Sequence, residues 1–89
     1  MIKMGKVAIR IRVMPDEAFV DMEKLKQKVV NIIPDYAKLT DSRIVPIAFG
    51  LKAIILQIIM PDQSPDELIE NIRKVENVEN VEVEDLSLI

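Results

Sequence analysis

The side chains that most often carry enzymatic chemistry are scarce in this sequence. Its 89 residues include no Cys and no His, so it has no thiolate nucleophile, no imidazole base and no ligands for a typical zinc or copper site. The two glycines, Gly5 and Gly50, stand apart and form no loop that would cradle a phosphate group. These absences predict no catalytic residue, no metal ligand and no cofactor.

The carboxylates are the one remaining class of reactive side chain. Paired Asp and Glu residues can transfer protons, and the chain has 15 acidic residues. Nearly all of them fall at the starts of predicted helices or at alternating strand positions, where helix capping or solvation accounts for them. The sequence therefore favours a protein that is not an enzyme, although a magnesium site of scattered carboxylates stays open at this point.

The charge is distributed unevenly along the chain. The net charge is −3, but residues 1–60 carry ten basic and six acidic side chains, whereas residues 61–89 carry two and nine. A negative balance argues against a protein that tracks nucleic-acid phosphates. The start of the chain lacks a secretory signal, and its most apolar stretch, residues 51–60, is about half of the ~20 residues that a spanning helix needs. We expect a soluble cytoplasmic protein that binds neither nucleic acid nor a membrane.

An internal repeat organises the elements that must position any site. Val13-Met14-Pro15-Asp16 recurs as Ile59-Met60-Pro61-Asp62, and each copy follows an apolar run and precedes a helix-like pattern. Two such units are too few for a solenoid, which needs more repeats to bury a continuous core. The repeat predicts two copies of strand, turn and helix within a single domain over residues 1–89.

The first copy reads as a strand followed by a helix. Alternating apolar residues predict a strand over residues 7–14, which Pro15 ends because proline has no N–H for the ladder. A helix is predicted from the N-cap Asp21 to residue 33. Its buried stripe is formed by Met22, Leu25, Val29 and Ile32.

The middle of the chain reads as two strands joined by a tight turn. After a polar link at residues 38–42, a strand is predicted over residues 43–49, and Pro46 places it at a sheet edge. Phe49-Gly50 indicates a tight connection into the most apolar element, residues 51–60. Near-continuous apolar character is typical of a central strand with both faces at least partly covered.

The last part carries the clearest local helix signal. Ser64 is predicted as the N-cap, Pro65 as the first helical residue and Glu67 as the partner carboxylate of a capping box. A closing strand follows over residues 78–86. The order strand, helix, strand, strand, helix, strand predicts an α+β ferredoxin-like βαββαβ sandwich, with a four-stranded antiparallel sheet and both helices on one face. In this topology the first and third strands are central, and the fourth pairs with the first.

One sheet face stays uncovered in such a fold. Arg10 and Arg12 point to this face, where Glu82 and Glu84 on the neighbouring strand are expected to pair with them. RNA-recognition modules stack bases on an open sheet face, but no aromatic residue falls in the middle of the two predicted central strands. Apolar residues of residues 51–60 would form a protein-binding patch on this face, or long neighbouring side chains would shield them. These two alternatives stay open.

The segment of residues 44–52, Ile-Val-Pro-Ile-Ala-Phe-Gly-Leu-Lys, resembles a family pattern. It is similar to the Pro-Ile/Val-Gly-aromatic-Gly-Ile-Lys segment in the guanine-nucleotide exchange domain of translation elongation factor 1 beta. The resemblance extends over essentially the whole chain, including Met22-Glu23-Lys24-Leu25 and the closing acidic strand. The length resembles the archaeal form, which consists of the exchange domain alone.

The resemblance implies exchange of GDP for GTP on elongation factor 1 alpha, which regenerates the form that delivers aminoacyl-tRNA. No covalent bond is broken. The sequence leaves the oligomeric state open, and a monomer is favoured. The family's turn aromatic, Phe49 here, packs against the G domain; the alternative is a core aromatic at the end of the sheet. The implied partner-binding residues are Ile47, Phe49, Gly50, Lys52, Leu86, Ser87, Leu88 and Ile89.

One position departs from the family pattern. Eukaryotic relatives carry a lysine next to last, directed at the magnesium site, and Leu88 stands there in this sequence. Lys52 matches a family position but lies too far along the third strand to replace that lysine. A rival function on the same fold is a small-ligand-binding or regulatory module that dimerises through the open sheet face.

Overall fold

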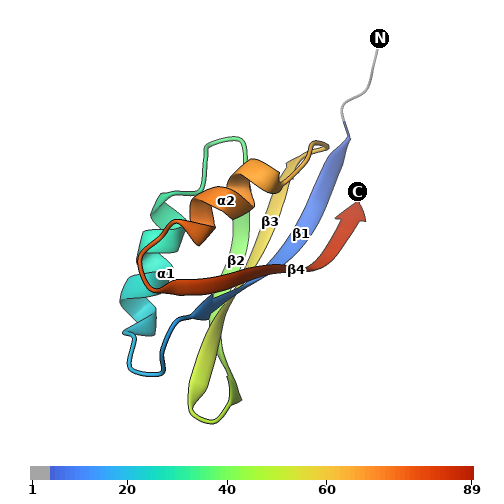
Figure 1. Cartoon of the computed structure of the whole chain (residues 1–89). Helices are drawn as coiled ribbons and strands as arrows, with labels where there is room; N and C mark the ends of the chain where they lie inside the picture. The colour runs from blue at the N-terminus through green and yellow to red at the C-terminus, as the bar shows by residue number, and fades with distance from the viewer. Residues whose placement is uncertain (1–4) are drawn as a thin grey trace.

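The computed structural model describes residues 5–89, which form a four-stranded antiparallel sheet and two helices (Figure 1). Residues 1–4, on which the prediction about a secretory signal partly rests, lie outside the described residues. The elements are β1 (Lys6–Pro15), α1 (Met22–Asn31), β2 (Lys38–Ala48), β3 (Leu51–Pro61), α2 (Asp66–Arg73) and β4 (Val78–Leu88). The strand order β2-β3-β1-β4 puts β1 and β3 in the centre and β4 beside β1. The predicted ferredoxin-like topology is confirmed.

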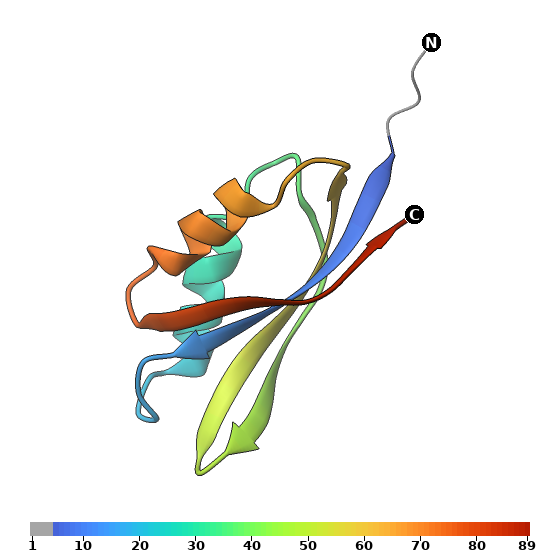
Figure 2. The ribbon, with the colours of Figure 1, turned by 45° about the vertical axis from the view of Figure 1, so that its right-hand side comes forward.

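Both helices cover one face of the sheet, and the other face is open (Figure 2). The core lies between them because alternate residues of β1 and β3 point to the same side and stand opposite one another, as in the pair Ile11 and Leu56. Leu25 and Val29 of α1 and Leu68 and Ile72 of α2 close the core from the helix side. The core residues of the two central strands are Val7, Ile9, Ile11, Val13, Ile54, Leu56, Ile58 and Met60.

The strands are much longer than the helices. Ten or eleven residues give each strand a length of roughly 35 Å, whereas α1 and α2, with ten and eight residues, measure about 15 and 12 Å. The molecule is accordingly elongated, with principal extents of 51 × 20 × 18 Å. The β2–β3 hairpin therefore projects beyond the helices at one end of the sheet, and the start of β1 and the end of β4 project at the other (Figure 1).

The start of α1 follows the prediction. The carboxylate of Asp21 accepts hydrogen bonds from the backbone N–H groups of Glu23, at 3.1 Å, and Lys24, at 3.3 Å, which makes it the N-cap. The helix ends at Asn31, two residues before the predicted end, so Ile32 is the C-cap and is exposed, and its predicted place in the buried stripe is wrong. The N–H of Ile32 turns back to the carbonyl of Val29, a tighter turn that closes the helix ahead of Pro34.

The start of α2 differs from the prediction. Pro65 is the N-cap, and its side chain makes no capping bond, so the proposed capping box is wrong. The Ser64 hydroxyl instead accepts a hydrogen bond from the N–H of Asp66, at 3.3 Å. Glu67 accepts one from the Tyr36 hydroxyl, at 3.2 Å, because the chain before β2 brings this phenol to the helix start. The Glu67 carboxylate therefore ties two segments together rather than capping its own helix.

β2 is longer than predicted, because residues 38–42 belong to the strand and are not a polar link. An edge strand with one open face tolerates polar residues, and Leu39 still packs against the core from within this stretch. The ladder is irregular between Leu39 and Asp41, where the Thr40 hydroxyl donates to the Gln57 carbonyl at 3.1 Å. The edge position that Pro46 predicted is confirmed by the strand order.

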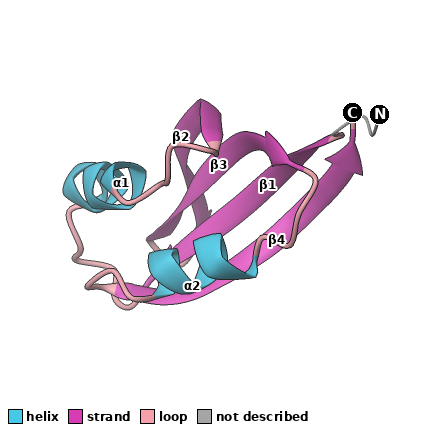
Figure 3. Ribbon diagram, turned by 90° about the horizontal axis from the view of Figure 1, so that it is seen from above, coloured by secondary structure: helices cyan, strands magenta, loops and turns pink. Residues whose placement is uncertain are grey.

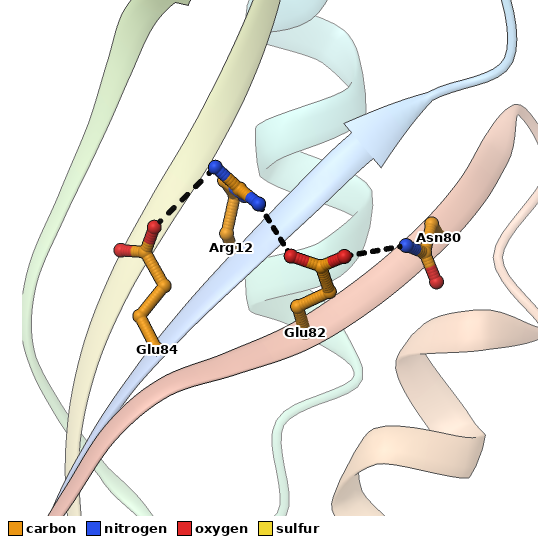
Figure 4. A network of polar contacts seen from close by, with 4 residues as sticks. All are labelled: Arg12, Asn80, Glu82 and Glu84. Atoms are coloured by element: carbon orange, nitrogen blue, oxygen red, sulfur yellow. Dashed lines mark hydrogen bonds and ion pairs between the residues drawn. The ribbon is translucent and has the colours of Figure 1, made fainter.

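On the open face, the Arg12 guanidinium bridges two carboxylates of β4 (Figure 4). It pairs with Glu82, which also accepts from Asn80 at 3.1 Å, and it lies 3.6 Å from the carboxylate of Glu84. The hydrogen bond to Glu82 and the attraction of its charge raise the pKa of Arg12. The same pairing predicted for Arg10 is wrong within the described residues, because Arg10 stands opposite Asp85 and forms no ion pair.

Long side chains shield the apolar residues of the open face. Ile55 lies between Arg12 on one neighbouring strand and Arg43 on the other, and it is only half-exposed. The aliphatic stems of two arginines can cover such a residue while their charges stay in water. Over residues 5–89, neither β1 nor β3 contributes any of the exposed large hydrophobic side chains. The shielded alternative therefore describes this face, and an exposed protein-binding patch does not.

Candidate partner-binding site

The tip of the β2–β3 hairpin is a two-residue turn that presents an aromatic ring to solvent. Ala48 pairs with Leu51, so only Phe49 and Gly50 make the turn, with φ angles of 52° and 78°. Positive φ at both central residues is the requirement of a type I′ turn, which matches the twist of the flanking strands. A residue with a Cβ pays about 1–2 kcal/mol for this conformation. Phe49 is 98% exposed, so the core alternative for its ring is wrong.

Two further predicted residues lie beside this tip. Lys52 is exposed and stands opposite Pro46, one pair below the turn. Ile47 is also exposed, at the point where the ladder is irregular between Pro46 and Ala48. We call Ile47, Phe49, Gly50 and Lys52 the hairpin-tip group.

The other predicted residues lie at the end of β4, which runs to Leu88, two residues beyond the predicted strand end. Leu88 stands opposite Val7, and the N–H of Ile89 donates to the carbonyl of Lys6 at 2.9 Å, so the chain end is held against β1. The side chains of Leu86, Leu88 and Ile89 are exposed on this edge strand, although Ile9 and Val7, which stand opposite Leu86 and Leu88 on β1, are buried. We call Leu86, Ser87, Leu88 and Ile89 the C-terminal group.

A β-bulge decides which side chains of β4 face the helix side of the sheet. Val83 pairs with Ile11 while Asp85 pairs with Arg10, so Glu84 is an extra residue in the ladder. The extra residue shifts the alternation by one, and Leu86 therefore points to the same face as Val83. Beyond α2 this face is uncovered, and it carries an exposed apolar row of Val83, Leu86 and Leu88.

Sequence reasoning missed Val83, although a signal for it was present. The apolar residues of β4 change phase from odd positions, Val81 and Val83, to even positions, Leu86 and Leu88. Such a change in a single strand indicates a bulge at the junction. Val83 stands opposite the buried Ile11, but on this edge strand it is 39% exposed.

The two groups lie at opposite ends of the sheet. The hairpin tip lies beyond the pair of Val13 and Ile54, whereas Leu88 stands opposite Val7 at the other end of β1. Val7 and Val13 alone are separated by about 20 Å of extended strand. The predicted partner-binding residues therefore form two surfaces, one at the hairpin tip and one at the end of β4. Figure 3 shows the end of β4 projecting past both helices.

A second exposed aromatic residue lies at the hairpin end and was missed. Phe19, in the loop between β1 and α1, is 92% exposed. An open hollow of about 380 Å³ separates this loop from the hairpin; its walls include Ala18 and Val20 on one side and Gly50 and Lys52 on the other. The only signal for Phe19 in the sequence is that it is the one aromatic residue in the short segment between the Pro-Asp turn and the helix N-cap Asp21.

The described part of the chain, residues 5–89, contains neither a metal-binding cluster nor a membrane-spanning helix. No group of three or more Asp and Glu side chains converges there as a set of metal ligands. No helix over residues 5–89 is both long enough and apolar enough to cross a bilayer. The site consists of exposed apolar and aromatic side chains, which are suited to protein contact.

Comparison with known proteins identifies the family of the chain. Residues 8–89 match the model of the EF-1 guanine nucleotide exchange domain. The chain belongs to the EF-1 guanine nucleotide exchange domain family. It is a guanine-nucleotide exchange factor for elongation factor 1 alpha. The chain itself is a translation factor and not an enzyme.

Archaeal relatives of the exchange family are similar over nearly their whole length. The chain is 48% identical over 88 residues to elongation factor 1-beta of Archaeoglobus fulgidus, covering 97% of this chain and 100% of the relative. It is 40% identical over 84 residues to the elongation factor 1-beta of Staphylothermus marinus, covering 91% and 93%. Corresponding values for Methanosarcina barkeri are 42% over 88 residues, with 93% and 97% covered. The match to the archaeal type is confirmed.

Solved structures with low sequence identity share the fold of this exchange domain. The ACT domain from GTP pyrophosphokinase of Chlorobium tepidum has a TM-score of 0.61 at 18% identity, covering 88% of this chain and 97% of that one. The C-terminal domain of the MgtC protein from Mycobacterium tuberculosis has a TM-score of 0.53 at 12% identity, covering 96% and 87%. At these identities the likeness concerns the fold alone, so it lends no support to the rival ligand-binding module.

Proposed function

We propose that the chain drives nucleotide release by contacting elongation factor 1 alpha at two places, with the hairpin-tip group and the C-terminal group. The observation that carries this proposal is their separation to opposite ends of a stiff, well-packed sheet. Each group is exposed, apolar at its centre and free of helix cover. A single partner that touches both ends must span the long axis of the molecule, and its two contact regions are then held at a fixed separation.

The energetic basis is a coupling between two binding equilibria. If the chain binds the nucleotide-free G protein more tightly than the GDP-bound one, GDP affinity falls by the same factor when the chain is bound. A sheet that fixes two contacts at a set distance favours one conformation of the partner over another. Release of GDP then allows GTP to bind, and the form that delivers aminoacyl-tRNA is regenerated.

The C-terminal group acts without a penultimate lysine. Leu88 is 70% exposed at the position where eukaryotic relatives carry that lysine, and it brings no ammonium group to a magnesium site. Lys52 does not replace it, because it lies with the hairpin-tip group at the opposite end. Apolar packing by Leu86, Leu88 and Ile89, together with hydrogen bonds of the strand end, supplies this contact.

One chain is sufficient for both contacts, so the exchange factor acts as a monomer, in the cytoplasm where elongation takes place. The shielded open face gives no apolar surface for the rival dimer over residues 5–89. Nucleic acid and membranes have no part in the proposed contacts, which involve protein surfaces only.

The direct test is release of fluorescently labelled GDP from the cognate elongation factor 1 alpha into excess GTP. The chain is expected to accelerate release in proportion to its concentration until the partner is saturated. Binding of the chain to nucleotide-free and GDP-bound partner should differ by the same factor by which the chain weakens GDP binding. No acceleration by well-folded protein would contradict the proposal.

A further inference from the structure

We infer that Phe19 is a second aromatic contact for elongation factor 1 alpha at the hairpin end, and this inference rests on the proposed function. Phe19 is 92% exposed, although burial of a phenylalanine side chain away from water is favourable in free energy. Phe49, with 98% of its area exposed, is the other such residue at this end. Exposed apolar side chains that gather at one place commonly mark a protein-binding surface.

The loop that carries Phe19 is fixed at both ends. At its start, the N–H of Asp16 donates to the carbonyl of Asn77 at 2.9 Å. At its end, Asp21 caps α1, and the preceding residue, Val20, packs against the core. Because the residue next to it is anchored inward, Phe19 cannot fold into the core and is presented outward.

Phe19 and the hairpin tip flank the same hollow. Its walls include the two neighbours of Phe19, Ala18 and Val20, and the residue after Phe49, Gly50. The hairpin and the β1–α1 loop lie at the same end of the molecule in both ribbon views (Figures 1 and 2). A partner surface that covers the Phe49 ring is therefore continuous with one that reaches Phe19.

Because the Phe19 surface is continuous with the proposed contact of the hairpin tip, the same partner is expected to bind both. The partner is the G protein itself, with a ridge or loop that enters the hollow between the β1–α1 loop and the hairpin. Aromatic side chains are the residues most often responsible for binding energy in interfaces, because their large rigid rings bury much area at little entropic cost. A second copy of this chain is the competing occupant.

The test compares three variants of the full chain in the GDP-release assay: Phe19→Ala, Phe49→Ala and the double substitution. Phe19→Ala should raise the concentration that gives half-maximal release about tenfold and leave the maximal rate unchanged, because the residue contributes to binding away from the nucleotide. The double variant should raise the concentration for half-maximal release by less than the product of the two single-variant factors, since both rings contact one surface. Phe19→Leu should recover part of the loss.

A matched control is Ile32→Ala. Ile32 is an exposed apolar residue at the other end of α1, and its substitution should leave exchange unchanged. Thermal unfolding of each variant separates a lost contact from a lost fold. Wild-type kinetics for Phe19→Ala combined with slow exchange for Phe49→Ala would overturn the inference and leave the proposed function standing.

The remaining outcomes are also distinct. If neither aromatic variant differs from the wild type, both the hairpin contact and the inference are wrong, and exchange depends on the C-terminal group. If the wild type itself does not speed release, the proposed function fails. If sedimentation shows that the wild type is a dimer and that Phe19→Ala converts it to a monomer, the surface binds a second copy of the chain and the inferred partner is wrong.

Discussion

The two ends of the sheet expose apolar residues by different means. At the hairpin end, a two-residue turn with positive φ at Phe49 and Gly50 fixes one ring at a tip. At the other end, an edge strand carries three aliphatic side chains in a row, and only one of its two backbone edges is paired, with β1. The first surface is a point contact whose geometry is set by the turn. The second is extended, and it offers free backbone groups as well as side chains.

The two contacts should therefore respond differently to substitution. A point contact depends on one side chain, so losing that side chain removes most of it. An extended row distributes the contact over several residues, so single substitutions should be weaker than truncation.

The largest effect is expected for Phe49→Ala. Removing a central aromatic anchor typically weakens an interface by about 2 kcal/mol, which would raise the half-maximal concentration in GDP release roughly 30-fold. The ring is fully exposed in the free chain, so the free energy of unfolding should change by less than about 0.5 kcal/mol. Urea unfolding measures this second quantity. A loss of several kcal/mol there would mean that the ring packs within the chain.

Truncation after Ser87 should have the next largest effect. It removes Leu88 and Ile89 and the hydrogen bond from Ile89 to Lys6. We expect exchange to slow about tenfold, the equivalent of 1.4 kcal/mol, and Leu88→Ala alone to slow it less, because the row shares the contact. GDP release at a fixed chain concentration compares the two variants. Equal losses would show that Leu88 is a point contact like Phe49.

Gly50→Ala should lower the stability of the fold through its effect on the hairpin turn alone. A Cβ at Gly50 meets no atom within 4 Å, so the cost comes from its φ of 78°. We expect the free energy of unfolding to fall by about 1 kcal/mol, since the left-handed conformation is unfavourable for alanine. Chemical denaturation measures the loss, and Ala48→Gly, one residue before the turn, serves as the comparison. An unchanged stability would indicate that the turn readily adopts another form.

The smallest effect is expected in the middle of the sheet, between the two contacts. Glu82→Gln removes one charge from the Arg12 pair on the open face, and a partly exposed ion pair contributes less than about 1 kcal/mol. The loss should shrink further at high salt, because exposed charges are screened. GDP release should match that of the wild type. Slower release by this variant would extend the contact across the open face.

The regular parts of the fold could be predicted from local patterns. Alternation in residues 7–14 located β1, the short polar side chain of Asp21 located the start of α1, and Pro46 placed β2 at an edge. Each of these signals acts between residues that are close in the chain, so a short stretch of sequence is enough to recognise it. The turn at Phe49-Gly50 was predicted for the same reason.

Features that depend on distant partners could not be predicted in this way. Glu67 looked like half of a capping box, but the Tyr36 hydroxyl, 31 positions earlier, lies beside it in the fold. Residues 38–42 are polar and still form a strand, because the edge of the sheet leaves them one solvated face. The separation of the predicted partner-binding residues into two surfaces follows from the register of β4 on β1, which no local pattern specifies.

The difference in length between strands and helices has a consequence for how this molecule varies. The side chains that hold the sheet to the helices lie in the middle, and none of the hairpin-tip or C-terminal residues belongs to that core. Mutations that change stability and mutations that change partner recognition therefore fall at separate positions. A lineage that adapts to a hotter or colder habitat can repack its interior without altering the surfaces that its G protein must recognise.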